Sequence, residues 1–255
     1  MNKLEALKKL RSKLNNGGFS LGSWIQLESS SSAEILSNGN YDWLTVDLEH
    51  GSISISQLPD IFRAIELNNT LPLVRLSEGT PVDCKRALDA GAGGVIIPKI
   101  ETSLQLDSII NSCRWPPNGD RGVGFSRANL YGDQFDKYKE EAAQPFIVAM
   151  IESKRALENI DEILSVGGLD AILVGPYDLS ASLGFTGEIN HPLVENSIKE
   201  LISACKNHSI PAGIHIVKPD IEELKIKIKN DYQFIAYSID TVFLNFISKN
   251  PMINS

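Results

Sequence analysis

Short apolar runs alternate with longer amphipathic stretches along most of this chain. Each run is rich in Val, Ile and Leu and shows little alternation between apolar and polar positions. This pattern is typical of strands that are buried on both faces, as in a parallel sheet. The runs span residues 21–27, 43–47, 71–76, 94–97, 146–151, 171–174, 212–217 and 234–238.

The segments between the runs place apolar residues at helical spacing. These helical patterns cover residues 55–68, 82–90, 103–113, 156–166, 193–207 and 221–230. Before the first run, Leu4, Leu7, Leu10 and Leu14 form a further amphipathic pattern that stops at residues 15–18, Asn-Asn-Gly-Gly. We expect this N-terminal segment to be a helix that covers the base of the domain.

About eight strand–helix units follow one another without a Gly/Ser-rich linker. That count predicts an α/β fold, a (β/α)8 TIM barrel, in which residues 1–255 form a single domain. A doubly wound open sheet is the alternative. Because no Gly-x-Gly-x-x-Gly motif follows the first run, a dinucleotide-binding fold has little support.

Composition and charge narrow the choice of partners. The chain has a net charge of -8 and no run of Lys and Arg with interleaved aromatic residues, which argues against nucleic acid and against anionic membranes as partners. The charged start and the lack of a long apolar stretch predict a cytoplasmic protein. Cys84, Cys113 and Cys205 have no metal-binding spacing, so we expect reduced thiols on helices.

Two acidic residues follow two of the apolar runs, and they suggest a metal site. Glu152 comes directly after residues 146–151, and Asp178 comes four residues after residues 171–174. The carboxyl ends of parallel strands meet at one face, so the two carboxylates should converge there. With no His or Cys nearby, they suit a hard cation such as Mg²⁺ or Mn²⁺. Taken singly, Glu152 could instead be a first-turn acid of the following helix, and Asp178 could cap the next helix.

Further polar residues stand at the ends of other runs. His50 follows Asp47 and Glu49 at the end of residues 43–47, where a general base should lie, although a hydrogen-bonded loop histidine would have the same sequence. Arg75 ends an otherwise apolar run, and its burial requires an anion, either a carboxylate of the substrate or Asp47 or Glu49.

Three other residues allow more than one interpretation. Lys99 ends the fourth run and could form a Schiff base, but we expect Glu101 to pair with it and keep it charged. Asp89 is by its spacing a helix-end acid that could orient His50. His215 also projects from a strand run, and the sequence assigns it no role.

One connection is much longer than the others. Residues 116–134 contain Pro, Gly and Asp and no strong periodicity. Long connections inside compact domains are usually functional, so we expect this segment to lie over the mouth of the barrel.

A set of motifs in fixed order resembles one known family. The motifs are Asp47-Leu48-Glu49-His50, Leu73-Val74-Arg75, Trp115-Pro116-Pro117-Asn118-Gly119-Asp120-Arg121-Gly122, Ile151-Glu152 and Gly175-Pro176-Tyr177-Asp178-Leu179-Ser180. In this respect the chain resembles the HpcH/HpaI aldolases, class II pyruvate aldolases of the phosphoenolpyruvate/pyruvate barrel superfamily. The resemblance extends from about residue 22 to about residue 240.

The resemblance implies a metal-dependent aldolase that reversibly cleaves a 4-hydroxy-2-oxo acid to pyruvate and an aldehyde through a metal-bound pyruvate enolate. It implies Glu152 and Asp178 as ligands of Mg²⁺, Mn²⁺ or Co²⁺. His50 would be the general base, paired with Asp89, and Arg75 would steady the pyruvate oxygen. The remaining implied site residues are Gly175, Pro176 and Tyr177, which would bind substrate, and Asp47 and Glu49, which would support the site.

The same resemblance implies a homo-oligomer, such as a hexamer of paired barrels that exchange their C-terminal helices. The chain departs from the family at Met150, where a Gln is common, and at Tyr177, where a small residue is usual. The segment around Lys99 is closer to the citrate lyase β-subunit and malyl-CoA lyase branch. The alternatives are therefore a lyase acting on a CoA thioester and a catalytically silent metabolite-binding barrel.

Overall fold

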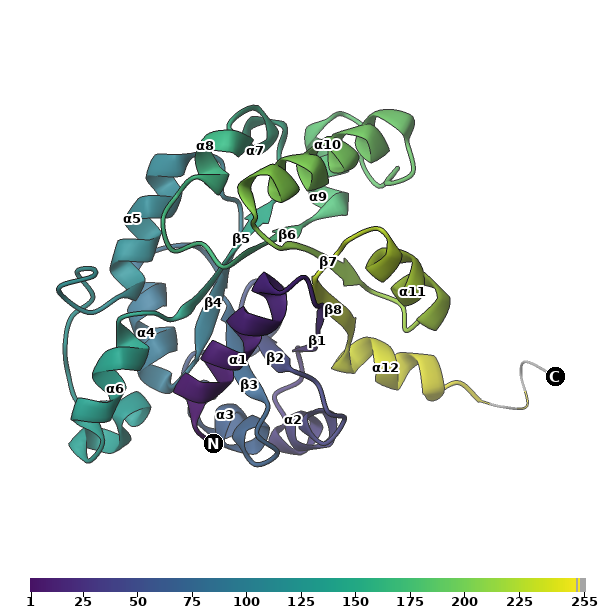
Figure 1. The fold of residues 1–255 in the computed structure, drawn as a ribbon. Helices are drawn as coiled ribbons and strands as arrows, with labels where there is room; N and C mark the ends of the chain where they lie inside the picture. The colour runs from purple at the N-terminus through teal and green to yellow at the C-terminus, as the bar shows by residue number, and fades with distance from the viewer. Residues whose placement is uncertain (251, 253–255) are drawn as a thin grey trace.

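The computed structural model describes residues 1–250 and 252. Within them, eight parallel strands pair in chain order and close into a barrel. The strand boundaries agree with the apolar runs to within two residues, so the (β/α)8 prediction is confirmed and the open sheet is excluded (Figure 1). The strands are β1 (Ser20–Ile25), β2 (Trp43–Asp47), β3 (Leu71–Arg75), β4 (Gly94–Ile97), β5 (Phe146–Ile151), β6 (Ala171–Val174), β7 (Ala212–Ile216) and β8 (Phe234–Ile239).

Helices surround the barrel, and most of the longer ones lie where the periodicity places them. The helices are α1 (Lys3–Asn15), α2 (Ser30–Ser37), α3 (Leu58–Glu66), α4 (Pro81–Ala90), α5 (Ser103–Cys113), α6 (Phe135–Ala142), α7 (Lys154–Glu158), α8 (Ile160–Leu164), α9 (Pro176–Ser182), α10 (Pro192–His208), α11 (Ile221–Lys229) and α12 (Asp240–Ile247). The pattern at residues 156–166 is two short helices, α7 and α8, that meet at Asn159. The apolar runs and helical patterns do not indicate α2, α6, α9 or α12.

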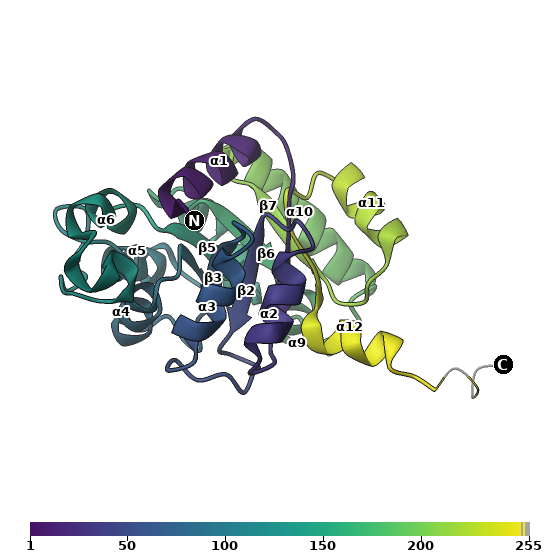
Figure 2. The same cartoon turned by 90° about the horizontal axis from the view of Figure 1, so that it is seen from below.

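Large side chains fill the barrel interior near the amino ends of the strands. Trp43 and Phe234 stack with their ring centroids 4.2 Å apart, and Phe146 packs beside them. A Cβ atom on Gly22 would lie 2.1 Å from the Trp43 ring, so only glycine fits there. Below this layer α1 places its buried leucines against the barrel, as predicted for a helix on the base, while α9 lies at the opposite end (Figure 2).

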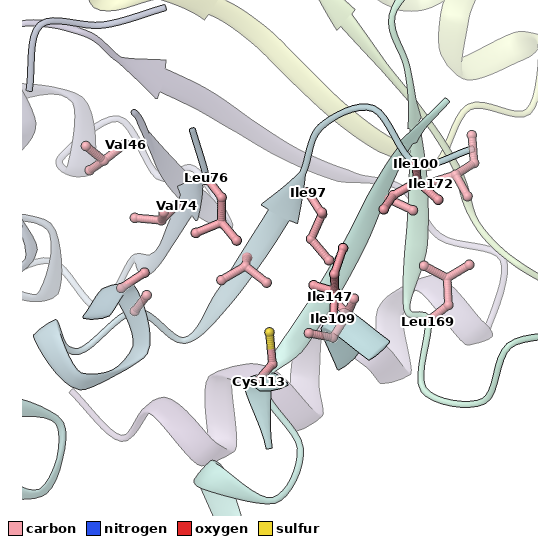
Figure 3. Close-up of a cluster of buried hydrophobic side chains, with 14 of the residues drawn as sticks. Val46, Val74, Leu76, Ile97, Ile100, Ile109, Cys113, Ile147, Leu169 and Ile172 are labelled. Atoms are coloured by element: carbon pink, nitrogen blue, oxygen red, sulfur yellow. The ribbon is translucent and has the colours of Figure 1, made fainter. Parts of the chain in front are cut away.

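A second apolar layer lies between the strands and the helices. Figure 3 shows outward side chains such as Ile97 and Ile147 beside Ile109 and Cys113 of α5. Cys113, like Cys84 and Cys205, is a free and buried thiol on a helix, as the sequence predicted.

The prediction for the long connection is wrong. Arg127 binds Glu66 through Nη2 at 2.6 Å and donates to the carbonyl oxygen of Ala90 at 3.1 Å. Those two residues end α3 and α4, at the base of the barrel, because each helix runs back from the carboxyl ends of the strands. Nearby, Arg121 donates to the Tyr138 hydroxyl at 2.8 Å. Aromatic and arginine contacts thus hold the connection against the side and base, away from the mouth.

The C-terminal helix behaves differently from the others. In both views α12 projects from the barrel beside β8 (Figures 1 and 2), and its Leu244, Phe246 and Ile247 are exposed. Exchange of this helix between subunits stays a prediction. Among the helices in the described part of the chain, none combines the length and apolar character needed to cross a membrane.

Candidate active site

A cavity at the carboxyl ends of the strands continues between α10 and α11, and its total volume is about 950 Å³. Side chains from β1, β3, β5 and β7 form its floor, and the segments after β2 and β6 form part of its wall. Most of the predicted site residues therefore share one cavity. Those that line it are His50, Arg75, Glu152, Gly175, Pro176, Tyr177 and Asp178.

Arg75 and Asp47 form a buried ion pair across neighbouring strands. Arg75 donates from Nε and Nη2 to the two Asp47 carboxylate oxygens at 2.8 and 2.6 Å, and Gln26 donates to Asp47 at 2.8 Å. Burial works to raise the pKa of Asp47, but the hydrogen bonds and charge of Arg75, together with Gln26, outweigh it and lower that pKa. The pair is thus charged, and it fixes the guanidinium in the floor of the cavity.

The third guanidinium nitrogen of Arg75 faces a second carboxylate, that of Glu49. Its Nη1 lies 3.2 Å from Glu49 Oε2, and its guanidinium stacks at 4.4 Å over the Trp24 ring. His50 lies next to this cluster, with Nε2 4.0 Å from Glu49 Oε2 and a side chain that is 62% exposed. The histidine therefore faces the open side of the cavity, where it can exchange protons with solvent.

Lys99 does not have the predicted partner. Its Nζ lies 4.0 Å from Glu49 Oε1, whereas Glu101 accepts from Ser153 and pairs with Arg155. The Lys99 backbone has a left-handed conformation, with φ at 53°, and its N–H donates to Glu152 at 2.9 Å. The contribution of this residue to the site is a backbone donor, since its side chain is exposed.

Glu152 is buried at the end of β5. Burial raises its pKa to about 7; the Lys99 N–H acts in the opposite direction, and the nearby Glu49 and Asp178 carboxylates add to the rise. Gly175 packs against this side chain, because a Cβ atom there would lie 2.6 Å from Oε1. Ser153, not Glu152, caps α7. The interpretation of Glu152 as a first-turn acid of that helix is therefore wrong, since the helix begins at Lys154, and the carboxylate lines the cavity.

Asp178 lies in the first turn of α9 and is exposed to the cavity. In the described residues, no group of three or more His, Cys, Asp and Glu side chains could hold a metal ion. The fit of an ion thus depends on two carboxylates, and the Asp178 carboxylate is close enough to Glu152 to add to the rise of its pKa that burial causes. A small hard cation that takes its other ligands from water and substrate fits such a pair.

Asp89 is not brought to His50 within one chain. It lies near the end of α4, at the base of the barrel, whereas His50 lies at the mouth. Burial raises the pKa of Asp89, opposed by the charges of Arg121 and Lys85. The two predicted partners thus stand at opposite ends of the barrel.

Sequence reasoning missed two residues of the site and left a third without a role. Trp24 supports Arg75, and Gln26 binds Asp47. They are two residues apart, in and just after the first strand, so the period of a strand places them on the same face. His215 lies at the end of β7 with its ring 5.4 Å from Trp24.

Comparisons with known proteins point to the same family that the sequence motifs resemble. Residues 20–245 match the family model described as HpcH/HpaI aldolase/citrate lyase. A hydroxypyruvate/pyruvate aldolase of Roseobacter denitrificans is 34% identical over 93% of each chain, and a 2-keto-3-deoxy-L-rhamnonate aldolase of Salmonella gallinarum is 35% identical over 90% of this chain and 86% of its own. An HpcH/HpaI aldolase/citrate lyase family structure from Burkholderia cenocepacia superimposes with a TM-score of 0.90 at 32% identity, covering 96% of this chain and 98% of that one.

Proposed function

Since the chain belongs to the HpcH/HpaI aldolase/citrate lyase family and is a carbon–carbon lyase of the aldolase type, we propose that it cleaves 4-hydroxy-2-oxo acids reversibly to pyruvate and an aldehyde. The observation that supports this most directly is the arrangement in one cavity of Glu152, Asp178, Arg75 and His50. Two carboxylates, a fixed cation and an accessible base are the groups that formation of an enolate requires.

Glu152 and Asp178 would hold Mg²⁺, Mn²⁺ or Co²⁺. When bound, the ion supplies positive charge beside the 2-oxo group and the carboxylate of pyruvate. Gly175 keeps the space that Glu152 needs, and the Lys99 N–H fixes one carboxylate oxygen. The position of the carboxylate is therefore set before any ion arrives.

Arg75 would stabilise the negative charge that develops on the substrate oxygen. Its two bonds to Asp47 hold the guanidinium in place, and burial beside Trp24 lowers the local dielectric, which strengthens the interaction. In aldol cleavage, a base takes the proton of the 4-hydroxyl group as the C3–C4 bond breaks, and the electron pair of that bond passes to the 2-oxo acid. We assign that proton transfer and its reverse to His50, and also the removal of a proton from C3 of pyruvate when the enolate forms in the absence of an aldehyde.

We propose the pairing of His50 with Asp89 only between two chains of an oligomer. Because the two lie at opposite ends of one barrel, Asp89 of a second copy would have to reach the cavity. The predicted homo-oligomer would provide such a copy.

Exchange of the pyruvate methyl protons in D₂O, followed by NMR, tests the proposal without knowledge of the aldehyde. We expect exchange with Mg²⁺, Mn²⁺ or Co²⁺ that stops on addition of a chelator and is lost in His50→Ala and in Asp178→Ala. His208→Ala and Asp161→Ala are matched controls, since these residues pair with each other on α10 and α8, outside the cavity. Absence of exchange with every metal would contradict the pyruvate assignment, and exchange that survives the chelator would contradict the role of the metal.

A further inference from the structure

His215 is a histidine of the cavity that the proposed reaction does not use. It stands at the carboxyl end of β7 and lines the same cavity as Arg75 and Glu152. His215 is intermediate in exposure, whereas its neighbours Ile214 and Ile216 are buried. The imidazole thus reaches the space where a substrate would lie.

The backbone of β8 fixes the tautomer of this ring. Ser238 has a left-handed conformation, with φ at 58°, at the place where the pairing of β1 with β8 shifts register. Its carbonyl oxygen accepts from Ser23 Oγ at 3.2 Å and lies 3.3 Å from His215 Nε2. Because a carbonyl oxygen can only accept, Nε2 must bear the hydrogen, and Nδ1 must then present a lone pair.

The surroundings also keep the ring neutral. Burial lowers the pKa of His215 to about 4, and the Arg75 charge contributes in the same direction, against the Ser238 carbonyl and Asp47. Within the described residues, the ring makes its hydrogen bond through Nε2. Nδ1 is therefore a neutral acceptor on a side chain that lines the cavity.

The position of His215 indicates which part of the substrate it would meet. In the floor of the cavity Trp24 contacts both groups: the Arg75 guanidinium lies 4.4 Å from its ring, and the His215 ring lies 5.4 Å from it. His215 is thus next to the ring that supports Arg75, the residue to which we assign the substrate oxygen.

Pyruvate offers nothing for this acceptor, because its methyl, keto and carboxylate groups contain no hydrogen-bond donor. A hydroxyl group on C3 would supply the donor. We propose that His215 Nδ1 accepts a hydrogen bond from the hydroxyl group of a 3-hydroxy-2-oxo acid, so that this chain prefers hydroxypyruvate to pyruvate. This inference rests on the proposed function and names its substrate class.

Proton exchange at C3 in D₂O gives kcat/KM for hydroxypyruvate and for pyruvate. The first value divided by the second does not depend on how much of a variant is folded. We expect this ratio to be above one. It should fall about three- to tenfold in His215→Phe, which keeps a ring against Trp24 but has no acceptor. His215→Asn keeps a polar atom near the position of Nδ1 and should retain the preference for hydroxypyruvate. His215→Gln keeps a polar atom near the position of Nε2 and should lose that preference. An unchanged ratio in His215→Phe would overturn the proposal.

Two further measurements separate the possible failures. If instead His215→Phe changes the preference between glycolaldehyde and acetaldehyde as acceptors, the hydroxyl group belongs to the aldehyde, and the assignment to the 2-oxo acid is wrong. ¹⁵N NMR of the histidine rings should show an unprotonated Nδ1 that shifts on addition of hydroxypyruvate and not of pyruvate. This shift can be observed even if neither acid exchanges, so failure of the proposed function would be distinguishable; a protonated Nδ1 in the free protein would refute the inference.

Discussion

Replacing Glu152 with Gln should stabilise the metal-free protein at high pH. The Glu152 carboxyl group is buried, and its pKa is raised to about 7 by that burial and by the nearby Glu49 and Asp178. In the unfolded chain the same group has a pKa of about 4.5. The folded state therefore holds this proton more tightly than the unfolded state does.

The sign and size follow from linkage. Below about pH 4.5 both states are protonated and the group costs nothing. Between pH 4.5 and 7 the unfolded state ionises first, so stability falls as the pH rises, by 1.36 kcal/mol for each pKa unit of difference; above pH 7 the full cost remains. A difference of about 2.5 units gives a loss of about 3 kcal/mol from Glu152. Gln at position 152 has no charge and would not incur this loss.

Urea unfolding of the metal-free wild type and of Glu152→Gln, at intervals from pH 4.5 to pH 8, measures the effect. The stability of the variant relative to the wild type should rise by about 3 kcal/mol across this range. Glu158→Gln is a matched control, since that side chain on α7 is 62% exposed, and it should give a flat difference. A flat difference for Glu152→Gln as well would refute the argument that this carboxylate is an uncompensated buried charge.

Two other substitutions test the geometry of the site. Gly175→Ala would place a Cβ atom 2.6 Å from Glu152 Oε1 and should weaken Mn²⁺ binding, measured by calorimetry, at least about tenfold. In the control Gly167→Ala the new Cβ atom meets nothing within 4 Å, and the affinity for Mn²⁺ should not change. Equal affinities in the two variants would show that the carboxylate can move. Arg75→Met leaves Asp47 buried without its cation and should cost about 3–5 kcal/mol in urea unfolding, and the double variant with Asp47→Asn should cost less than the sum of the single changes. Additive costs would show that the two residues do not depend on each other.

Most strands could be predicted because they are buried on both faces and therefore form nearly continuous apolar runs. Trp43–Asp47, Gly94–Ile97 and Phe146–Ile151 have the boundaries that the runs gave. The helices were less regular. Ser30–Ser37 is short and rich in serine, and Asp240–Ile247 exposes several of its apolar residues, so neither has a clear apolar face.

The position of the long connection could not be predicted. Its proline and glycine residues indicate irregular backbone but contain no information about direction. Arg127 reaches Glu66 and the end of α4 across sequence separations of 61 and 37 residues, and these contacts decide that the segment lies at the base.

The sequence by itself determined the barrel and the set of polar residues at the ends of its strands, since both follow from local periodicity and chain order. Only the tertiary structure decided which of them meet. It places Asp89 and His50 at opposite ends of the barrel and pairs Lys99 with Glu49 instead of Glu101. It also brings Trp24, Arg75 and His215 together from three strands. The physical reason is that ion pairs, stacking and hydrogen bonds act over a few ångströms in space, and closure of the barrel creates those distances between residues that are far apart in the chain.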